Sequence, residues 1–332
     1  MIILAPLVRV SLGTAMALGL IEGLREVASS TAYLMTYSES KCDENCAFCP
    51  QARSSTSSAD RLSRISWPTW DLDEVVARLG ESKSTRRVCL QCLNYVGMVD
   101  DAATVIERVR ESFTGPLSIC TPPLGEADLK RVRAAGATDI GIAIDAATPE
   151  VFDSVKGAAR NSSYTWELHH DALRRALTVF DRGHVTTHVI VGLGERESDV
   201  ARFIFTMLEA GIRVSLFAFT GVRGTDMHDA KPPDLGAYRR LQIVLYLASR
   251  RLLTPDKVNE DRNGHLTLAV ESSWLQQVLS SGAAFRTAGC PGCDRPYYNE
   301  RPRGPMYNYP RPLTPEETAA AIADSGLVRS NG

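Results

Sequence analysis

The stretch KCDENCAFCPQARSS (residues 41–55) places three cysteines, Cys42, Cys46 and Cys49, within eight residues. It follows directly on TAYLMTY (31–37), whose β-branched and aromatic residues predict a strand. A tetrahedral zinc site normally takes four protein ligands, whereas three thiolates on an iron–sulfur cubane leave one iron free to bind something else. The CxxxCxxC spacing therefore favours an iron–sulfur cluster with an open corner over a zinc loop or plain buried thiols.

The other cysteines also fall mostly into short-spaced groups. The chain has eight cysteines in 332 residues, too few for a disulfide-stapled miniprotein. Cys89 and Cys92 form one pair and Cys290 and Cys293 another, while Cys120 stands alone. Grouping of this kind is typical of metal ligation in a reducing compartment, so we expect a cytoplasmic protein.

The composition limits the possible partners. Hydrophobic residues make up 44% and charged residues 23% of the chain, with a net charge of −2. No basic field favours nucleic acid or an anionic membrane as a partner. The uncharged run Val10–Ile21 is too short to span a bilayer. It predicts a buried helical segment within residues 1–30.

From residue 31 to 253 the sequence alternates between short apolar runs and helix-period runs, in six β-then-α units. The predicted strands are 31–37, 86–93, 116–123, 138–146, 185–195 and 213–220. The predicted helices are 72–80, 100–113, 126–136, 165–183, 198–211 and 235–252. Residues 52–68 read as an irregular loop. This order predicts an α/β fold with a parallel sheet, and six units suit a partial (β/α)6 barrel with its ligands at the carboxyl ends of the strands.

The last segment, residues 254–332, changes character. Prolines, tyrosines and arginines cluster in CPGCDRPYYNERPRGPMYNYPRPL, which begins at Cys290. We expect an irregular C-terminal extension that folds over the mouth of the barrel.

The cysteine loop resembles the signature of the radical S-adenosylmethionine (SAM) superfamily, CxxxCxφC with an aromatic residue at φ, here Phe48. The resemblance implies a partial barrel and a [4Fe–4S] cluster on Cys42, Cys46 and Cys49. In this family SAM binds the fourth iron. An electron from a low-potential donor then cleaves SAM to methionine and a 5′-deoxyadenosyl radical, which abstracts hydrogen from an unactivated carbon.

A second stretch resembles the fifth-strand element of that superfamily, GxIxGxxE. In HVIVGLGE, His188 replaces the first glycine, while Gly192 and Glu195 are retained. The resemblance places the SAM adenine near Gly192 and near Phe217 and Phe219 of the next strand.

Three further residues are predicted to contact SAM. The second-strand GGE element of the superfamily is absent, and Gln91 and Cys92 stand in its place. Asp145, at the end of the fourth strand, suits a ribose hydroxyl, or alternatively caps the helix that begins at Pro149. No catalytic residue is assigned beyond these contacts.

Within the superfamily, residues 40–225 are most similar to biotin synthase. That family holds a second, sacrificial cluster on three strand cysteines and an arginine, and Cys89 and Cys120 correspond to two of these cysteines. Thr186 stands where the third would be. The resemblance therefore implies an auxiliary cluster built differently, on Cys89, Cys120, Cys290 and Cys293, with Cys92 as the alternative to Cys89.

The whole chain resembles the archaeal biotin synthase-related proteins, which include two-component lipoyl synthases. That resemblance implies sulfur insertion into an octanoyl chain on a lipoyl carrier domain, with a second radical SAM subunit as a partner. Two alternatives stay open: a radical SAM enzyme of another class, such as a methylase or mutase, and a non-catalytic iron–sulfur or zinc protein. The tail arginines either anchor an acidic carrier or form a solvated face. They are Arg295, Arg301, Arg303 and Arg311.

Overall fold

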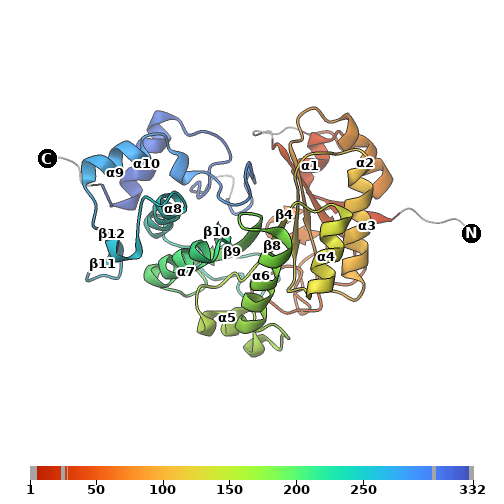
Figure 1. Cartoon of the computed structure of the whole chain (residues 1–332), viewed down its shortest axis with the longest axis horizontal. Helices are drawn as coiled ribbons and strands as arrows, with labels where there is room; N and C mark the ends of the chain where they lie inside the picture. Colours follow the sequence, from red (N-terminus) through yellow and green to blue (C-terminus); the bar gives the residue numbers. More distant parts are fainter. Residues whose placement is uncertain (1–5, 24–26, 28, 301–303, 329–332) are drawn as a thin grey trace, which may run out of the picture.

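The computed structural model describes residues 6–23, 27, 29–300 and 304–328. Its centre is an eight-stranded sheet with the order β10-β9-β8-β7-β6-β2-β1-β5. Figure 1 shows the helices on the outside of the curved sheet, with the C-terminal elements α9 and α10 at the end opposite α1, α2 and α3. The strand order confirms the predicted α/β fold with a parallel sheet of the partial-barrel type.

Six of the strands are parallel and alternate with helices, as predicted. The strands are β2 (Thr31–Thr36), β6 (Arg87–Gln91), β7 (Leu117–Thr121), β8 (Asp139–Ile142), β9 (Val185–Val191) and β10 (Arg213–Ala218). The helices are α2 (Leu72–Glu81), α3 (Met98–Arg110), α4 (Glu126–Ala135), α5 (Pro149–Val155), α6 (Trp166–Phe180), α7 (Glu197–Ala210) and α8 (Leu235–Ser249). Their apolar faces pack on the outer face of the sheet and form one core.

The strand register decides which residues share a layer inside the barrel. Gln91 pairs with Cys120, Cys120 with Gly141, and Gly141 with Thr186. Cys89 lies one layer nearer the amino ends of the strands. Because side chains alternate between the two faces of a strand, Cys89, Gln91 and Cys120 all point to the same, inner face.

The N-terminal segment differs from the prediction of a helix. Residues Leu7–Val10 form strand β1, which pairs antiparallel with β2 and with β5 (Thr69–Asp71). The helix α1 that follows covers only Leu12–Ala17 and is capped by Ser11. The run LVRV is β-branched at alternate positions, and Val8 and Val10 are buried, so pairing at the sheet edge wins over helix formation. No helix within the described ranges is long and apolar enough to cross a membrane.

The connection between β2 and α2 is more regular than expected. After the cysteine loop, the chain forms a small antiparallel hairpin of β3 (Arg61–Leu62) and β4 (Ile65–Ser66). Trp67 follows the hairpin and is buried against Met35 and Leu93. This packing fixes a segment that composition alone predicts to be an irregular loop.

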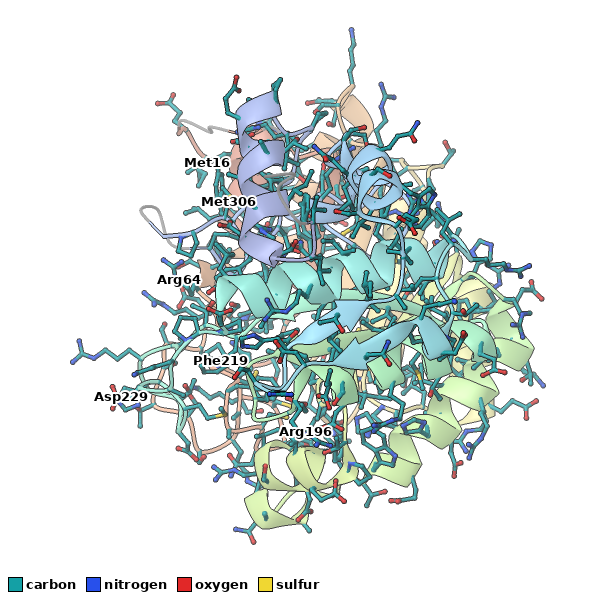
Figure 2. All side chains as sticks on the ribbon, turned by 90° about the vertical axis from the view of Figure 1, so that its left-hand side faces the viewer. Met16, Arg64, Arg196, Phe219, Asp229 and Met306 are labelled. Atoms are coloured by element: carbon teal, nitrogen blue, oxygen red, sulfur yellow. The ribbon has the colours of Figure 1, made fainter. Side chains whose placement is uncertain are left out.

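The C-terminal extension is also only partly irregular. It contains the hairpin β11 (Val258–Glu260) and β12 (Leu266–Leu268), helix α9 (Ser272–Leu279) and helix α10 (Pro315–Ser325). Thr314 and Glu317 form a capping box that begins α10, and Figure 2 shows this helix at a steep angle to α8, with one end against it. Between α9 and α10, where the prolines cluster, the described residues form only a 3-10 turn (Ala283–Phe285) and a bridge of Arg286 with Tyr309, which fits the expected irregular extension.

The extended segment is held by polar groups of α8. The buried Arg239 guanidinium donates to the carbonyl of Tyr307 at 2.7 Å, and the Gln242 amide donates to the same carbonyl at 2.9 Å. The Tyr238 hydroxyl donates to the Asn308 side chain at 3.1 Å. These bonds satisfy backbone that has no partner strand, and they fix the path of the tail along the barrel.

Candidate functional site

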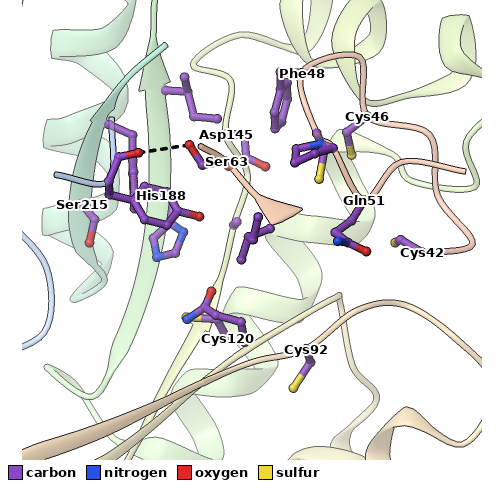
Figure 3. Close-up of a pocket in the computed structure, with 18 of the residues that line it drawn as sticks. Cys42, Cys46, Phe48, Gln51, Ser63, Cys92, Cys120, Asp145, His188 and Ser215 are labelled. Carbon is purple, nitrogen blue, oxygen red and sulfur yellow. Dashed lines mark hydrogen bonds between the residues drawn. The ribbon is translucent and has the colours of Figure 1, made fainter. Parts of the chain in front are cut away.

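All eight cysteines line one cavity inside the barrel, with a volume of about 280 Å³. None of them forms a disulfide. In Figure 3, Cys42 and Cys46 lie on one wall with Phe48, whereas Cys120 lies on another, beside His188. The fold therefore brings the three-cysteine loop and the scattered cysteines of the sequence to the same space.

The three-cysteine loop is held by two charged side chains that the sequence does not single out. The Lys41 ammonium donates to the carbonyls of Pro50, Ser55 and Ser57 at 2.9, 2.7 and 2.7 Å. The buried Glu44 carboxylate accepts bonds from Ser162 and Ser163 in the segment before α6. Together they fix the loop on both sides of the cysteines.

The thiols of this loop are poorly solvated. Burial raises the pKa of Cys49 to about 12, and burial also raises the pKa values of Cys42 and Cys46. Without a metal these thiols are protonated at neutral pH, so a metal that binds here must displace protons. Three buried thiols in one loop are the donor set that an iron–sulfur cubane needs.

A buried ion pair lies beside this loop. Lys156 Nζ is 2.7 Å from the Asp145 carboxylate and donates to the Ala143 carbonyl at 2.6 Å. The two side chains are only 6% and 12% exposed. Burial lowers the pKa of Lys156, but Asp145 and the thiols of Cys46 and Cys49 raise it more, so the ammonium stays charged.

Asp145 is not the cap of the following helix. Thr148 caps α5, with its side chain accepting a bond from the Val151 amide. The Asp145 backbone has a positive φ of 71° and forms a bridge to Val189 on β9. Its carboxylate lines the cavity, where it contacts Lys156. The alternative reading of Asp145 as a helix cap is therefore wrong.

Of the residues predicted to surround the SAM adenine, the structure places some in the cavity lining and others outside it. Phe219 lines the cavity and packs in a cluster with Ala47 of the cysteine loop. Gly192 lies behind it: a Cβ on Gly192, whose φ is +106°, would lie 3.2 Å from Phe219 Cβ. Glu195 lies outside the cavity lining and accepts a bond from the Ala147 amide at 2.8 Å, so it braces the loop that carries Asp145. Burial raises the pKa of Glu195.

The second group of thiols comprises Cys89, Cys120, Cys290 and Cys293. Cys290 Sγ lies 3.7 Å from Thr186 Oγ1 and accepts a bond from the Ser118 hydroxyl at 3.5 Å. Cys89 donates to Cys120, which raises the pKa of Cys89 and lowers that of Cys120. Cys290 thus lies beside Thr186 on β9, the position that corresponds to the third strand cysteine of biotin synthase.

The turn that carries Cys290 and Cys293 is fixed to the amino ends of the strands. Arg87 donates to the Pro291 carbonyl at 3.2 Å and pairs with the buried Asp139 at 3.0 Å. The Asp294 carboxylate accepts bonds from Ser29 and Ser30 at the start of β2. The turn therefore lies within the barrel, deeper than the predicted cover over the mouth.

Further along, the tail does reach the carboxyl ends of the strands. Thr220, after β10, donates to the Asn299 carbonyl at 2.7 Å, and Ser63 donates to the Tyr298 carbonyl at 3.1 Å. Residues 290–300 thus run from the amino ends of the strands to their carboxyl ends. Only the last part of this segment lies at the mouth.

The surroundings of the second thiol group fit a bulky cluster. A Cβ on Gly141 would lie 3.0 Å from Cys120 Sγ, so only glycine leaves this space free. Within the described ranges, no three His, Cys, Asp or Glu side chains converge on a single metal ion. A cubane does not require such convergence, because each thiolate bonds a different iron.

Gln91 and Cys92, predicted near SAM, both line the cavity. The Gln91 side chain donates to Cys89 Sγ at 3.1 Å, and the Cys92 amide donates to the Cys120 carbonyl at 2.8 Å. Both residues are therefore placed beside the second thiol group. Their contact with SAM stays a prediction.

A cluster of aromatic side chains also lines the cavity. The Phe217 ring lies 4.9 Å from the His188 ring and 5.5 Å from the Tyr298 ring. The Arg295 guanidinium is stacked on Phe217, with Cζ 3.8 Å from the ring centroid. Phe217 thus contacts the centre of the cavity rather than the cysteine loop.

The tail arginines do not form one docking face. Arg295 lines the cavity, and Arg311 pairs with Glu317 at 2.8 Å. Arg301 and Arg303 lie outside the described residues. Anchoring of an acidic carrier by these four arginines together is therefore not compatible with the positions of Arg295 and Arg311.

Lys156 and Tyr33 are cavity residues that the sequence reasoning missed. Tyr33 Oη lies 3.6 Å from Cys293 Sγ and accepts a bond from the Arg295 amide at 2.9 Å. A lysine near the end of a helix normally points to water, and a tyrosine inside a strand normally packs in a core. No local sequence signal distinguishes these two from such cases.

Six β/α units with a three-thiol loop after the first parallel strand define a partial-barrel iron–sulfur protein of the SAM-cleaving class. The chain belongs to the radical SAM superfamily, because the model of that family matches residues 40–207. It is also 24% identical over 266 residues to a biotin synthase of Synechococcus sp. (strain RCC307), and the match covers 76% of each chain. The likeness to biotin synthase is distant.

Solved structures share the fold. The crystal structure of methylornithine synthase (PylB) superposes with a TM-score of 0.51 at 16% identity, covering 66% of this chain and 62% of that one. The [FeFe]-hydrogenase maturase HydG superposes with a TM-score of 0.52 at 14% identity, covering 63% and 48%. The chain thus spans less than two thirds of the length of these two proteins. At such identities the likeness concerns the fold alone.

Proposed function

We propose that this radical SAM enzyme inserts sulfur into unactivated C–H bonds of an octanoyl chain, as the lipoyl synthases it resembles do. The observation that supports this proposal is the single cavity lined by two thiol groups. One group suits a SAM-cleaving cluster, and the other suits a cluster that gives up sulfide. A substrate between them is within reach of both.

Cys42, Cys46 and Cys49 would hold the first [4Fe–4S] cluster, with SAM on the fourth iron. Lys41 and Glu44 orient the loop, and Lys156 places a positive charge beside it. When bound, this cluster supplies the electron, received from a low-potential donor, that cleaves SAM. Phe48, Phe219 and the buried walls exclude water from the reacting atoms.

Cys89, Cys120, Cys290 and Cys293 would hold the auxiliary cluster, which supplies sulfide. Its protein environment is built from both the barrel and the extension, because two of the thiols are on strands and two are on the tail. The extension, residues 254–332, is therefore a part of the active site. An octanoylated carrier domain and a second radical SAM subunit are the proposed macromolecular partners.

The test is a single turnover of anaerobically reconstituted protein with an octanoyl-lysine peptide. We expect one variant, with Cys290 and Cys293 both changed to alanine, to cleave SAM and insert no sulfur. Wild-type protein should form the thiolated product, measured by mass spectrometry. Sulfur insertion by the variant at the wild-type level would contradict the proposal. SAM cleavage without insertion by both proteins would favour another radical SAM reaction class.

A further inference from the structure

The centre of the cavity holds two polar groups that the cysteine clusters do not use. Arg295 and Tyr298 both line the cavity, and both contact Phe217. Both belong to the tail, immediately after Cys293. Tyr298 interacts electrostatically with Cys49 and with Cys120, one residue from each thiol group.

The Arg295 guanidinium is enclosed by the protein, and only some of its hydrogen-bond donors are used by the described residues. Of its five N–H donors, one bonds to the Ala288 carbonyl at 3.0 Å. No Asp or Glu carboxylate in the described part of the chain forms an ion pair with it. The cavity's other buried cation, Lys156, is by contrast neutralised by Asp145 at 2.7 Å. Arg295 is thus a cavity-lining cation without a carboxylate partner among the described residues.

The Tyr298 hydroxyl, like the Arg295 guanidinium, has hydrogen-bonding capacity that the described residues do not use. Its ring packs edge-on against Phe217, with centroids 5.5 Å apart. Its backbone carbonyl is fixed by Ser63, but none of the described residues bonds to its hydroxyl. A hydroxyl and a guanidinium that contact the same aromatic ring in the same cavity supply donors to the oxygen atoms of a bound substrate.

We propose that Arg295 and Tyr298 form a subsite for the acyl oxygen of an aliphatic substrate, with the hydrocarbon chain lying along Phe217 and Ile190 toward the cysteine loop. This inference rests on the proposed function and adds the polar group that fixes the substrate. Either the carbonyl of an acyl amide or the carboxylate of a free acid supplies such an oxygen. Phe217 and Ile190 offer apolar surface to the chain.

The test is a binding titration of reconstituted holoenzyme with two probes, an octanoyl-lysine peptide and free octanoate. The variants are Tyr298→Phe, which removes only the hydroxyl, and Arg295→Met, which removes the charge and keeps most of the length. The matched controls are Tyr246→Phe and Arg250→Met, which alter a similar stacked pair on the surface of α8. Iron content is measured for every protein.

For whichever probe binds the wild type, we expect Kd to rise about fivefold to tenfold in Tyr298→Phe and about tenfold to a hundredfold in Arg295→Met. The controls should bind as the wild type does. Stronger binding of the peptide indicates an amide carbonyl, and stronger binding of octanoate indicates a free acid.

Three results would overturn the inference. If Kd is unchanged in both variants, Arg295 and Tyr298 do not bind the acyl oxygen, although the octanoyl chain can still be the substrate. Loss of iron in Arg295→Met, with normal binding by Tyr298→Phe, would assign the guanidinium to the cluster. Failure of the wild type to bind either probe would reject the acyl subsite together with the octanoyl substrate. Binding without sulfur insertion would instead contradict the proposed reaction and leave the subsite standing.

Discussion

Lys156 and Asp145 show how single residues shape the environment of the cysteine loop. Their carboxylate–ammonium contact of 2.7 Å is buried, so each charge depends on the other. The pair also borders the thiols of Cys46 and Cys49, where added negative charge from a cluster would be stabilised by the ammonium.

Changing one member of this pair should be more harmful than changing both. We expect Lys156→Met or Asp145→Asn to lower the free energy of unfolding by about 3 kcal/mol, because a buried charge is left unpaired. The double variant should recover most of this loss. Urea unfolding of reduced, cluster-free protein measures the three values. Equal losses in the single and double variants would contradict the ion-pair argument.

A second prediction for single residues concerns the thiols of the cysteine loop. We expect Cys46→Ala to abolish SAM cleavage, since the first cluster loses a ligand and the electron has no source. Cys290→Ala is the matched control, because it removes a thiol from the same cavity and should leave SAM cleavage intact. Release of 5′-deoxyadenosine, measured by chromatography, separates them. Wild-type release by Cys46→Ala would refute the assignment.

Among the helices and strands, the six parallel strands were predictable from the sequence, whereas the antiparallel strand β1 was not. The strands are near-continuous apolar runs that end in turn residues, a local signal that determines strand type and order. Strand β1 has only a four-residue alternating pattern, and its pairing depends on β2 and β5, which are distant in sequence. The cysteine loop, like the parallel strands, was predictable from a local signal, the spacing of its three cysteines.

The extension was harder to predict for the same reason. The path of residues 290–300 is set by bonds with Arg87, Ser63 and Thr220, all of which are distant in sequence. A proline-rich composition indicates an extended chain but contains no information on where that chain lies. The sequence thus predicted that CPGC carries ligands, but not that its turn enters the barrel.

The contact of Cys290 with Thr186 gives a prediction for this element. If Cys290 supplies the ligand that a cysteine at position 186 would supply, Cys290→Ser should lose the second cluster. Adding Thr186→Cys to that variant should restore much of it, because the two side chains lie 3.7 Å apart. Iron content and Mössbauer spectra report the recovery. The control adds Thr187→Cys, on the other face of β9, which should restore nothing. Recovery only in that control would contradict the assigned geometry.

At the scale of the whole molecule, burial makes stability depend on pH. His169 is buried between Phe152 and Tyr164, with ring centroids 5.0 and 4.8 Å away. Burial, with a contribution from Lys156, lowers the pKa of His169 to about 2. The unfolded chain therefore binds a proton below pH ~6.5 that the folded protein does not bind.

Acid should accordingly weaken the wild type more than a variant without this group. Between pH 7.5 and 5.5 we expect the free energy of unfolding to fall by about 1.4 kcal/mol more in the wild type than in His169→Gln. The stabilising effect is complete above pH ~6.5 and is lost progressively as the pH falls toward the folded pKa. Urea unfolding at the two pH values measures it. An identical pH dependence in both proteins would contradict the buried, neutral state of His169.

If one cavity holds two separate clusters, the iron content and the Mössbauer spectra of reconstituted protein must show both. We expect about eight irons per chain in the wild type, and about four in each of two variants. One variant changes Cys42, Cys46 and Cys49 to alanine, and the other changes Cys290 and Cys293 to alanine. About four irons in the wild type, unchanged when the tail cysteines are removed, would exclude a second cluster.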